Sequence, residues 1–317
     1  MITRRGFIGA AGAIVAAQRP LAAAQGPLVW LNMNQKQLDD AYDQTVWASN
    51  QQQVQGRWAS NSEIVRQRIG PPRRFAYGPT PIEALDVYTT DRPNAPITLF
   101  IHGGAWRAGV AKNYGFPAET VVRAGGHYIA LDFINVIESG GNLAPMADQV
   151  RRAVAWVYRN ASMFGGDPNR IYLSAQSSGA HLAGVVVVTD WPRQFNLPGD
   201  VVKGAVMTSG IYDLEPARLS ARSSYVTFTD EIEHDLSPQR HIGMLSCPLV
   251  LAHGTAESPE FIRQTRDFAA AIKAADKPVE LLVGDGYNHF EIVETFANPY
   301  GLLGRAVLEQ MRLPVSA

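Results

Sequence analysis

The fold is decided by one stretch of sequence, residues 170–182, which reads RIYLSAQSSGAHL. Its first half is typical of a strand and its second half of a helix, so Ser177 falls on the tight turn between them. A serine on such a turn presents its Oγ above the sheet, and the close backbone approach allows only very small residues two positions to either side. Ala175 and Gly179 meet that demand, whereas a nucleophile one position later would place Gln176 there. We therefore expect Ser177 to be a nucleophile, the alternative being a serine that only caps a helix.

An acid and a histidine follow in the chain order that this turn requires. Residues 248–252 and 279–283 read as strands, and Glu257 and His289 lie in the loops beyond them. His289 is the only one of the seven histidines that follows Glu257. Neutral His289 would take the proton of Ser177, and ionised Glu257 would hold the ring in the required tautomer.

Each of these assignments has a plain structural alternative. Glu257 would then be a solvated loop charge and His289 a surface histidine. Asp213 and Asp285 are rival acids, but Asp213 follows an earlier strand and Asp285 lies only four residues before His289. The three chosen residues fall at three strand ends in the correct order, so we favour a catalytic triad with Glu257 as its acid.

A glycine-rich loop follows another apolar strand. Residues 97–101 run into residues 102–106, which read HGGAW. Backbone N–H groups in such a loop can stabilise the negative charge that forms on a carbonyl oxygen during acyl transfer. We expect an oxyanion hole from the N–H groups of Gly103, Gly104 and Ser178.

Several segments resemble the α/β-hydrolases of the kynurenine formamidase (arylformamidase) type, neighbours of the hormone-sensitive-lipase-like esterases. The segments are residues 102–106, 174–182, 209–216 (SGIYDLEP), 257–261 (ESPEF) and 288–290 (NHF). The resemblance implies a serine hydrolase that cleaves a small, aromatic N-formyl amide or another amide through an acyl-enzyme. A carboxylesterase for short-acyl or aryl esters is the alternative. A non-catalytic ligand-binding protein on the same scaffold is a third, less favoured reading, since such proteins typically lose a triad member.

Strands and helices alternate along the chain. Strands are expected at residues 97–101, 128–133, 171–175, 203–209, 249–252 and 279–283, with helices at 38–53, 146–160 and 261–273 and an opening hairpin from 73–77 and 83–88. This alternation predicts an α/β fold, with a mostly parallel central sheet, helices on both faces and ligands beyond the carboxyl ends of the strands.

Residues 212–246 lack a clear core strand, and we expect them to form a small cap over Ser177. Aromatic side chains of the cap and of the glycine-rich loop would then line a substrate site. The candidates for substrate binding are Trp106, Tyr212, Tyr225 and Phe228. The alternative is that at least two of the four only pack in the core, because aromatic residues dominate cores generally.

The N-terminus has the pattern of an export leader. Residues 3–8 (TRRGFI) match a twin-arginine motif, and residues 7–17 are apolar but too short to span a bilayer. Small residues at 22–24 offer a cleavage site. We expect residues 1–24 to be a signal peptide, residues 25–317 to be a single α/β-hydrolase domain, and the protein to be periplasmic or secreted. An uncleaved N-terminal helix is the alternative.

The composition limits the classes of partner and cofactor that we expect. The chain has 28 basic and 29 acidic residues, which argues against a nucleic-acid partner. The single Cys247 cannot form an intramolecular disulfide, and no clustered Cys/His spacing suggests a metal. We expect a small-molecule amide or ester substrate, no cofactor, no metal and no stable membrane anchor, and we leave a homodimer open.

Overall fold

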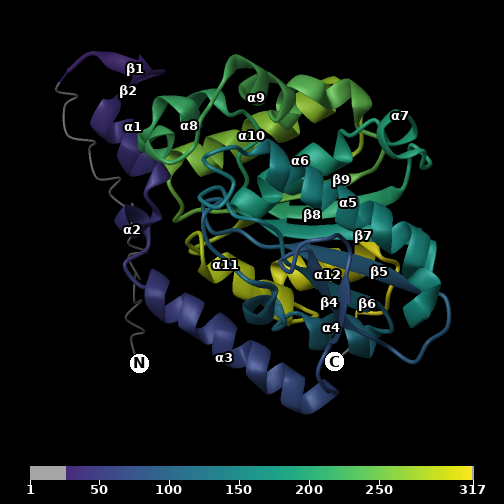
Figure 1. Cartoon of the computed structure of the whole chain (residues 1–317). Helices are drawn as coiled ribbons and strands as arrows, with labels where there is room; N and C mark the ends of the chain where they lie inside the picture. Colours follow the sequence, from purple (N-terminus) through teal and green to yellow (C-terminus); the bar gives the residue numbers. More distant parts are fainter. Residues whose placement is uncertain (1–25, 316–317) are drawn as a thin grey trace, which may run out of the picture.

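The computed structural model describes residues 26–315, so the expected signal peptide lies outside the described residues (Figure 1). A short two-stranded sheet pairs β1 (Leu28–Trp30) with β2 (Met33–Asn34). The strands of the main sheet are β3 (Arg73–Ala76), β4 (Ala84–Tyr88), β5 (Ala95–Ile101), β6 (His127–Leu131), β7 (Gly166–Gln176), β8 (Val202–Thr208), β9 (Leu249–Gly254) and β10 (Val279–Gly284). The eight strands lie in the order β10-β9-β8-β7-β5-β6-β4-β3.

The sheet is mostly parallel, as the alternation of strands and helices predicts. All pairs from β10 to β6 are parallel, and only β4 and β3 run antiparallel. The expected opening hairpin is therefore present as β3 and β4. Each expected strand also coincides with an observed one, with ends that differ by a few residues.

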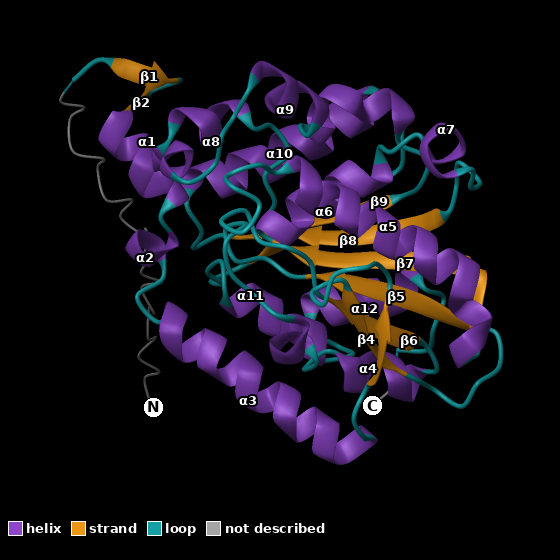
Figure 2. Ribbon diagram, in the orientation of Figure 1, coloured by secondary structure: helices purple, strands orange, loops and turns teal. Residues whose placement is uncertain are grey.

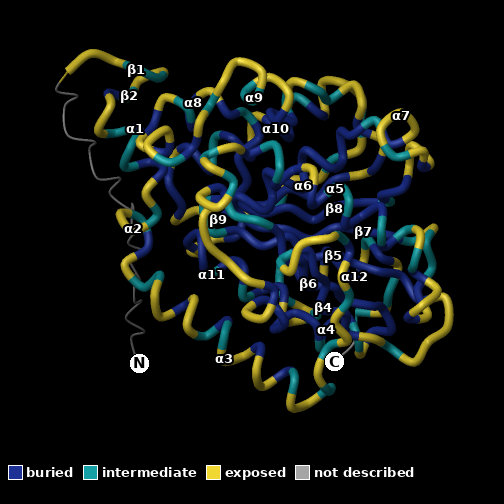
Figure 3. Tube along the Cα trace, in the orientation of Figure 1, coloured by how far each residue is buried: buried dark blue, intermediate teal, exposed yellow. Residues whose placement is uncertain are grey.

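The strands are buried on both faces because their side chains alternate between two cores. On β5, Ile97, Leu99 and Ile101 pack into the core on one face, while Phe100 packs into the core on the other. Figure 3 shows the central strands as almost continuously buried. The carboxyl ends of the six parallel strands, β5 to β10, thus meet at one rim of the sheet.

Helices cover both faces (Figure 2). The first face carries α1 (Gln35–Tyr42), α5 (Ala144–Asn160), α6 (Ser178–Val187), α7 (Trp191–Phe195), α8 (Glu215–Leu219) and α10 (Pro259–Ala274). The second face carries α3 (Gln51–Ile69), α4 (Ala118–Ala124), α11 (Glu291–Glu294) and α12 (Leu302–Gln310). The remaining helices are α2 (Gln44–Trp47), α9 (Asp230–Asp235), η1 (Ala111–Tyr114), η2 (Ala161–Phe164), η3 (Ala221–Ser224), η4 (Pro238–Met244) and η5 (Thr295–Ala297).

The helix expected over residues 38–53 is wrong as a single element, because the chain breaks twice there. Asp43 has extended φ and ψ angles, and its carboxylate accepts a hydrogen bond from the backbone N–H of Thr45, which ends α1 and starts α2. A second break at Asn50 precedes α3. A short polar side chain such as that of Asp43 can end one helix and begin the next within a uniformly polar segment, so the hydropathy pattern alone does not reveal the break.

Residues 212–246 contain α8, η3, α9 and η4 and no strand in the described chain. Within residues 26–315, the structure has no helix with the length and apolar character needed to cross a bilayer.

Candidate active site

The turn between β7 and α6 holds Ser177 in a strained conformation. Its φ of 55° lies in the left-handed region, which residues other than glycine rarely adopt. The Ser177 N–H donates to the carbonyl of Thr208, 2.9 Å away, and so fixes the turn to strand β8. A Cβ added to Gly179 would collide with the carbonyl oxygens of Ile101 and His102, so only glycine fits there. Ser177 lines the cavity, whereas the Ser178 hydroxyl accepts a hydrogen bond from the Trp106 N–H.

Ser177, His289 and Glu257 form one hydrogen-bonded row. The Ser177 Oγ lies 2.9 Å from Nε2 of His289, and Nδ1 of the same ring lies 2.8 Å from Oε2 of Glu257. All three residues are buried, with exposed fractions of 6%, 2% and 3%. Because Glu257 accepts from Nδ1, the neutral ring presents an unprotonated Nε2 to the serine hydroxyl.

Two further donors hold the Glu257 carboxylate. Its Oε1 accepts from the Ser209 hydroxyl at 2.7 Å and from the Gly254 N–H at 2.6 Å. Neither rival acid contacts the histidine. Asp213 forms an ion pair with Arg240 at 3.0 Å, and Asp285 accepts from the Thr255 hydroxyl at the surface.

The His289 ring is held by its neighbours. Phe261 packs edge-to-face against it with ring centres 4.6 Å apart, and Phe290 contacts it at 5.2 Å. Asn288 caps the following turn, and its side-chain amide donates to Asn50 at 2.9 Å. The loop that carries the histidine is therefore tied to the N-terminal part of the chain.

The glycine-rich loop is a tight turn beside the serine. Gly104 has a φ of 120°, and its carbonyl accepts from the N–H groups of Arg107 and Ala108 at 3.0 Å each. The Trp106 N–H donates to the Ser178 Oγ at 3.1 Å, which joins this loop to α6. The Ser178 N–H is at the first position of α6, where backbone N–H groups have no partner within the helix.

The cavity lining adds one candidate to the expected oxyanion donors. Gly104 and Ala105 line the cavity around Ser177, while Gly103 lies beside the cavity residue Gln176, where an added Cβ would stand 2.7 Å from the Gln176 side chain. The N–H group of Ala105 is thus a candidate donor beside those of Gly103, Gly104 and Ser178. The sequence motif did not mark Ala105, a non-glycine residue with a φ of 54°.

The cavity above Ser177 has a volume of about 450 Å³ and includes a wall that sequence reasoning missed. This wall consists of residues from α1, α2, α3 and their junctions: Asp39, Tyr42, Asp43, Gln44, Thr45, Gln51 and Gln55. Among the described residues, both amide atoms of Gln44 and the Oε1 of Gln51 are buried without a hydrogen-bond partner. The wall is therefore mostly polar, with Tyr42 as its aromatic member. Nothing in their sequence distinguishes these residues from an ordinary exposed helix.

Only part of the expected cap covers the serine. Ala221, Arg222, Ser224 and Tyr225 line the cavity, so Tyr225 is placed as expected. Tyr212 is fully buried and stacks on Phe268 with ring centres 4.3 Å apart. Trp106 is 2% exposed, and Phe228 packs edge-to-face on it at 6.4 Å. The expectation that Trp106, Tyr212 and Phe228 line the substrate site is thus corrected, because none of them lines the cavity: Trp106 and Tyr212 are buried in the core, and the half-buried Phe228 packs against it.

His181 links three segments below the site. The Trp106 indole N–H donates to its Nδ1 at 3.1 Å, and its Nε2 donates to the carbonyl of Leu236 at 2.7 Å. Burial lowers the pKa of His181 to about 4. The ring is therefore neutral at ordinary pH and has a structural role.

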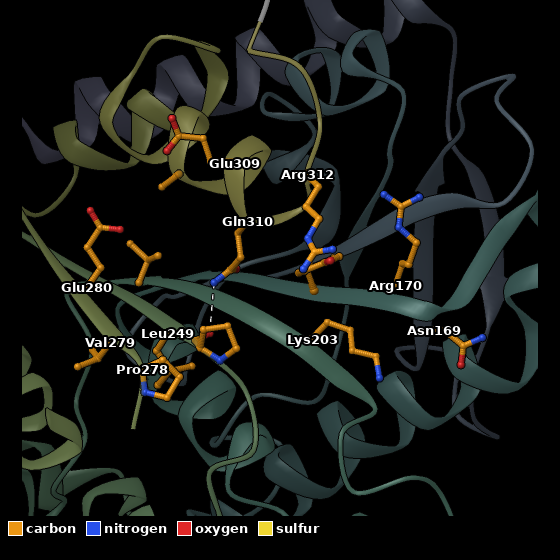
Figure 4. Close-up of a pocket in the computed structure, with 14 residues that line it drawn as sticks. Asn169, Arg170, Lys203, Leu249, Pro278, Val279, Glu280, Glu309, Gln310 and Arg312 are labelled. Carbon is orange, nitrogen blue, oxygen red and sulfur yellow. Dashed lines mark hydrogen bonds between the residues drawn. The ribbon is translucent and has the colours of Figure 1, made fainter. Parts of the chain in front are cut away.

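Two other features lie away from this site. A cavity of about 830 Å³ lies at the amino ends of the strands, where Leu249 and Val279 begin β9 and β10 and Lys203 is the second residue of β8. Figure 4 shows the residues that line it. Ligands of open α/β sheets bind at the opposite rim, where the triad lies. His234, Asp235 and His241 could hold a cation, since their ligand atoms lie within 4.8 Å of one another. They do not line the catalytic cavity.

A serine on a strand-to-helix turn, paired with a histidine and an acid at the strand ends, defines a serine hydrolase of the α/β-hydrolase class. The chain belongs to the BD-FAE family, whose model matches residues 85–272, more than half of the sequence. It is thus a hormone-sensitive-lipase-like α/β-hydrolase and an enzyme that hydrolyses amide or ester bonds.

Curated relatives agree with this class. The chain is 29% identical over 295 residues to a kynurenine formamidase of Danio rerio, covering 89% of this chain and 98% of the relative. It is 28% identical over 225 residues to esterase LipC of Mycobacterium tuberculosis, covering 65% and 56%.

Solved structures share the fold. One from Silicibacter sp. TM1040 has a TM-score of 0.73 at 20% identity, covering 84% of this chain and 97% of that one. Thermogutta terrifontis esterase 2 with propionate bound has a TM-score of 0.60 at 22% identity, covering 75% and 91%.

Proposed function

We propose that this enzyme hydrolyses a small, aromatic N-formyl amide, or a related small amide, through an acyl-enzyme on Ser177. The observation that carries the proposal is the unbroken row of hydrogen bonds from Ser177 through His289 to Glu257 at the floor of a polar cavity. The likeness to kynurenine formamidases of Danio rerio and Salmo salar, each 29% identical and 98% covered, supports the amide assignment.

The proposed reaction has two steps. Nε2 of His289 takes the hydroxyl proton while the Ser177 Oγ attacks the acyl carbon, and the negative charge on the former carbonyl oxygen is stabilised by backbone N–H groups of the glycine-rich loop and of Ser178. His289 then gives its proton to the leaving amine as the C–N bond breaks. Water, deprotonated by the same ring, attacks the acyl-enzyme and releases the acid (formate, for a formyl amide) and free Ser177.

A carboxylesterase acting on short-acyl or aryl esters is the second candidate. The likeness to an isoprenylcysteine methylesterase of Arabidopsis thaliana, 26% identical over 246 residues, and to esterase LipC favours it. Both reactions pass through the same oxyanion and differ mainly in how well His289 must protonate the leaving group. A purely ligand-binding role is disfavoured because all three triad side chains are in hydrogen-bond contact.

The test is a hydrolysis panel with purified protein from residue 25 onward. It compares N-formyl aromatic amines, acetylated aryl amides and p-nitrophenyl esters, with Ser177→Ala as the control. The amide proposal predicts the highest kcat/KM on the formyl amides. A clear preference for the esters would establish the second candidate. The absence of both turnover and labelling by a fluorophosphonate would refute both candidates.

We also propose that the protein is exported by the twin-arginine route, on the strength of Arg4 and Arg5 in the leader. Replacing both by lysine should retain an active precursor in the cytoplasm, as followed by cell fractionation. Wild-type protein that stays in the cytoplasm with residues 1–24 attached would contradict this proposal.

A further inference from the structure

The catalytic cavity contains a buried arginine without a carboxylate partner. Arg222 lines the cavity and is 5% exposed. Its guanidinium donates to the Tyr225 hydroxyl at 2.9 Å and to the carbonyl of Tyr42 at 3.2 Å. Its Nε–H is buried and has no partner in the part of the chain that the structure describes.

Aromatic faces replace an ion pair here. The guanidinium carbon lies 5.2 Å from the ring centre of Trp106 and 5.4 Å from that of Tyr42. Cation–π contacts offset part of the cost of burying a charge. A buried cation is nevertheless stable only when an anion and hydrogen bonds compensate for its lost hydration.

A buried acid beside Tyr42 already has a partner. Glu260 Oε2 lies 3.4 Å from the Tyr42 hydroxyl, and the two Glu260 oxygens accept from Arg263 at 2.7 Å and 2.8 Å. Within residues 26–315, no Asp or Glu oxygen lies within 4.0 Å of an Arg222 nitrogen. The chain thus pairs Arg263 internally and leaves Arg222 facing the cavity.

The other charged residues of the cavity also leave Arg222 without an acidic partner. Arg107 is exposed, stacks over the Tyr225 ring at 4.7 Å and forms no ion pair with a described residue. Asp39 accepts from the Ala221 N–H at 2.7 Å, and Asp43 caps α2 through Thr45. The two carboxylates therefore hold the wall together, while both arginines contact Tyr225, Arg107 at the ring and Arg222 at the hydroxyl.

We propose that Arg222, assisted by Arg107, binds a carboxylate of the substrate, so that the enzyme selects anionic amides or esters over neutral ones. The Nε–H of Arg222 supplies a charge-assisted hydrogen bond, and Tyr225 holds the two cations near each other through its ring and its hydroxyl. This proposal rests on the proposed function, because the anion is placed relative to a bond that Ser177 attacks.

The first test compares matched substrates on the wild-type enzyme. One pair carries the carboxylate on the leaving group, 2-formamidobenzoate against formanilide, and the other carries it on the acyl group, 4-nitrophenyl hydrogen succinate against 4-nitrophenyl butyrate. A charge-assisted hydrogen bond predicts about a 10- to 100-fold higher kcat/KM for the anionic member of one pair. Equal values within both pairs would overturn the proposal.

The second test removes the charge. Arg222→Met should abolish the preference, mainly through a higher KM for the anionic substrates, while Arg222→Lys should restore part of it. Arg218→Met is the control, because Arg218 pairs with Asp230 and Glu233 on the same segment and does not line the cavity. A preference that persists in Arg222→Met would contradict the proposal.

Two readouts separate a failure of this proposal from other failures. Labelling of Ser177 by an uncharged fluorophosphonate shows whether each variant keeps a working site. If Arg222→Met does not fold, the binding of 2-aminobenzoate and of 2-aminobenzamide to the wild-type enzyme is compared instead. The proposal requires that the anionic 2-aminobenzoate bind more tightly and that its affinity fall as salt is added. Loss of labelling in the wild type would instead refute the proposed function.

Discussion

Replacing Glu257 by glutamine should reverse the tautomer of His289. The Ser209 hydroxyl and the Gly254 N–H both donate to Oε1, at 2.7 Å and 2.6 Å, so the amide oxygen of the new side chain must occupy that position. Its NH₂ group then faces Nδ1 of His289 across 2.8 Å. Nδ1 becomes the acceptor and the ring proton moves to Nε2, where it points at the Ser177 Oγ, 2.9 Å away. The ring can no longer accept the serine proton.

The expected loss in kcat is large. It combines the loss of a general base with the loss of the charge that stabilises the imidazolium, and an amide in the equivalent place of a serine protease lowers kcat about 10⁴-fold. We expect kcat of Glu257→Gln to fall by about 10³- to 10⁴-fold, which corresponds to a loss of about 4 to 5.5 kcal/mol of transition-state stabilisation. Glu257→Ala removes the acid without forcing the wrong tautomer, so it should lose less.

The assay is kcat with any substrate that the wild type cleaves, together with thermal unfolding to show that each variant is folded. Asp213→Asn serves as the matched control, since Asp213 pairs with Arg240 and does not contact His289. A Glu257→Gln enzyme within tenfold of wild type, with a large loss in Asp213→Asn, would refute the assignment of the acid. An alanine variant that is less active than the glutamine variant would refute the tautomer argument.

Three other predictions concern the turn and the helix behind it. Ser177→Ala should abolish turnover and labelling by a fluorophosphonate, whereas Ser178→Ala should still be labelled; the opposite pattern would show that the nucleophile is one residue later. Gly179→Ala should destabilise the fold by about 3 kcal/mol or more in urea unfolding, because its Cβ meets backbone oxygens, while Gly243→Ala, with open space around it, should change stability by less than about 0.5 kcal/mol. Burial keeps the pKa of His181 at about 4 in the folded state, below the ordinary value of 6.5, so only the unfolded chain binds a proton between these pH values. Stability should therefore fall as pH decreases through this window, by about 1.4 kcal/mol per pH unit from this group, and His181→Gln should remove that part of the slope.

The parallel sheet and its catalytic rim were predictable because both depend on local patterns. Apolar strands followed by Ser177, Glu257 and His289 place three side chains at neighbouring strand ends, and the structure brings them into one hydrogen-bonded row. Their catalytic role stays a prediction that the substitutions above test. Gly179 was informative for the same local reason, since the turn leaves no room for a Cβ.

The substrate wall was not predictable, because it depends on contacts between distant parts of the chain. Gln44 and Gln51 look like exposed helix residues in the sequence, and only the fold places them across from Ser177. Hydropathy likewise could not separate Tyr225, which lines the cavity, from Tyr212, which stacks on Phe268 in the core. An aromatic residue satisfies both environments, so its type alone does not distinguish them.

The cavity wall built by α1, α2 and α3 lies apart in the sequence from the strand ends that hold Ser177, Glu257 and His289. Its residues fall within 39–55 and precede the segment of residues 85–272 that the BD-FAE model matches, and Ser177 lies within that segment. Substitutions of these wall residues can change which molecules enter the cavity, whereas Asn50 in the same stretch holds Asn288 beside His289 and must be kept. For protein engineering, the wall residues between 39 and 55 are thus a compact target for libraries that seek new substrates without repacking the sheet.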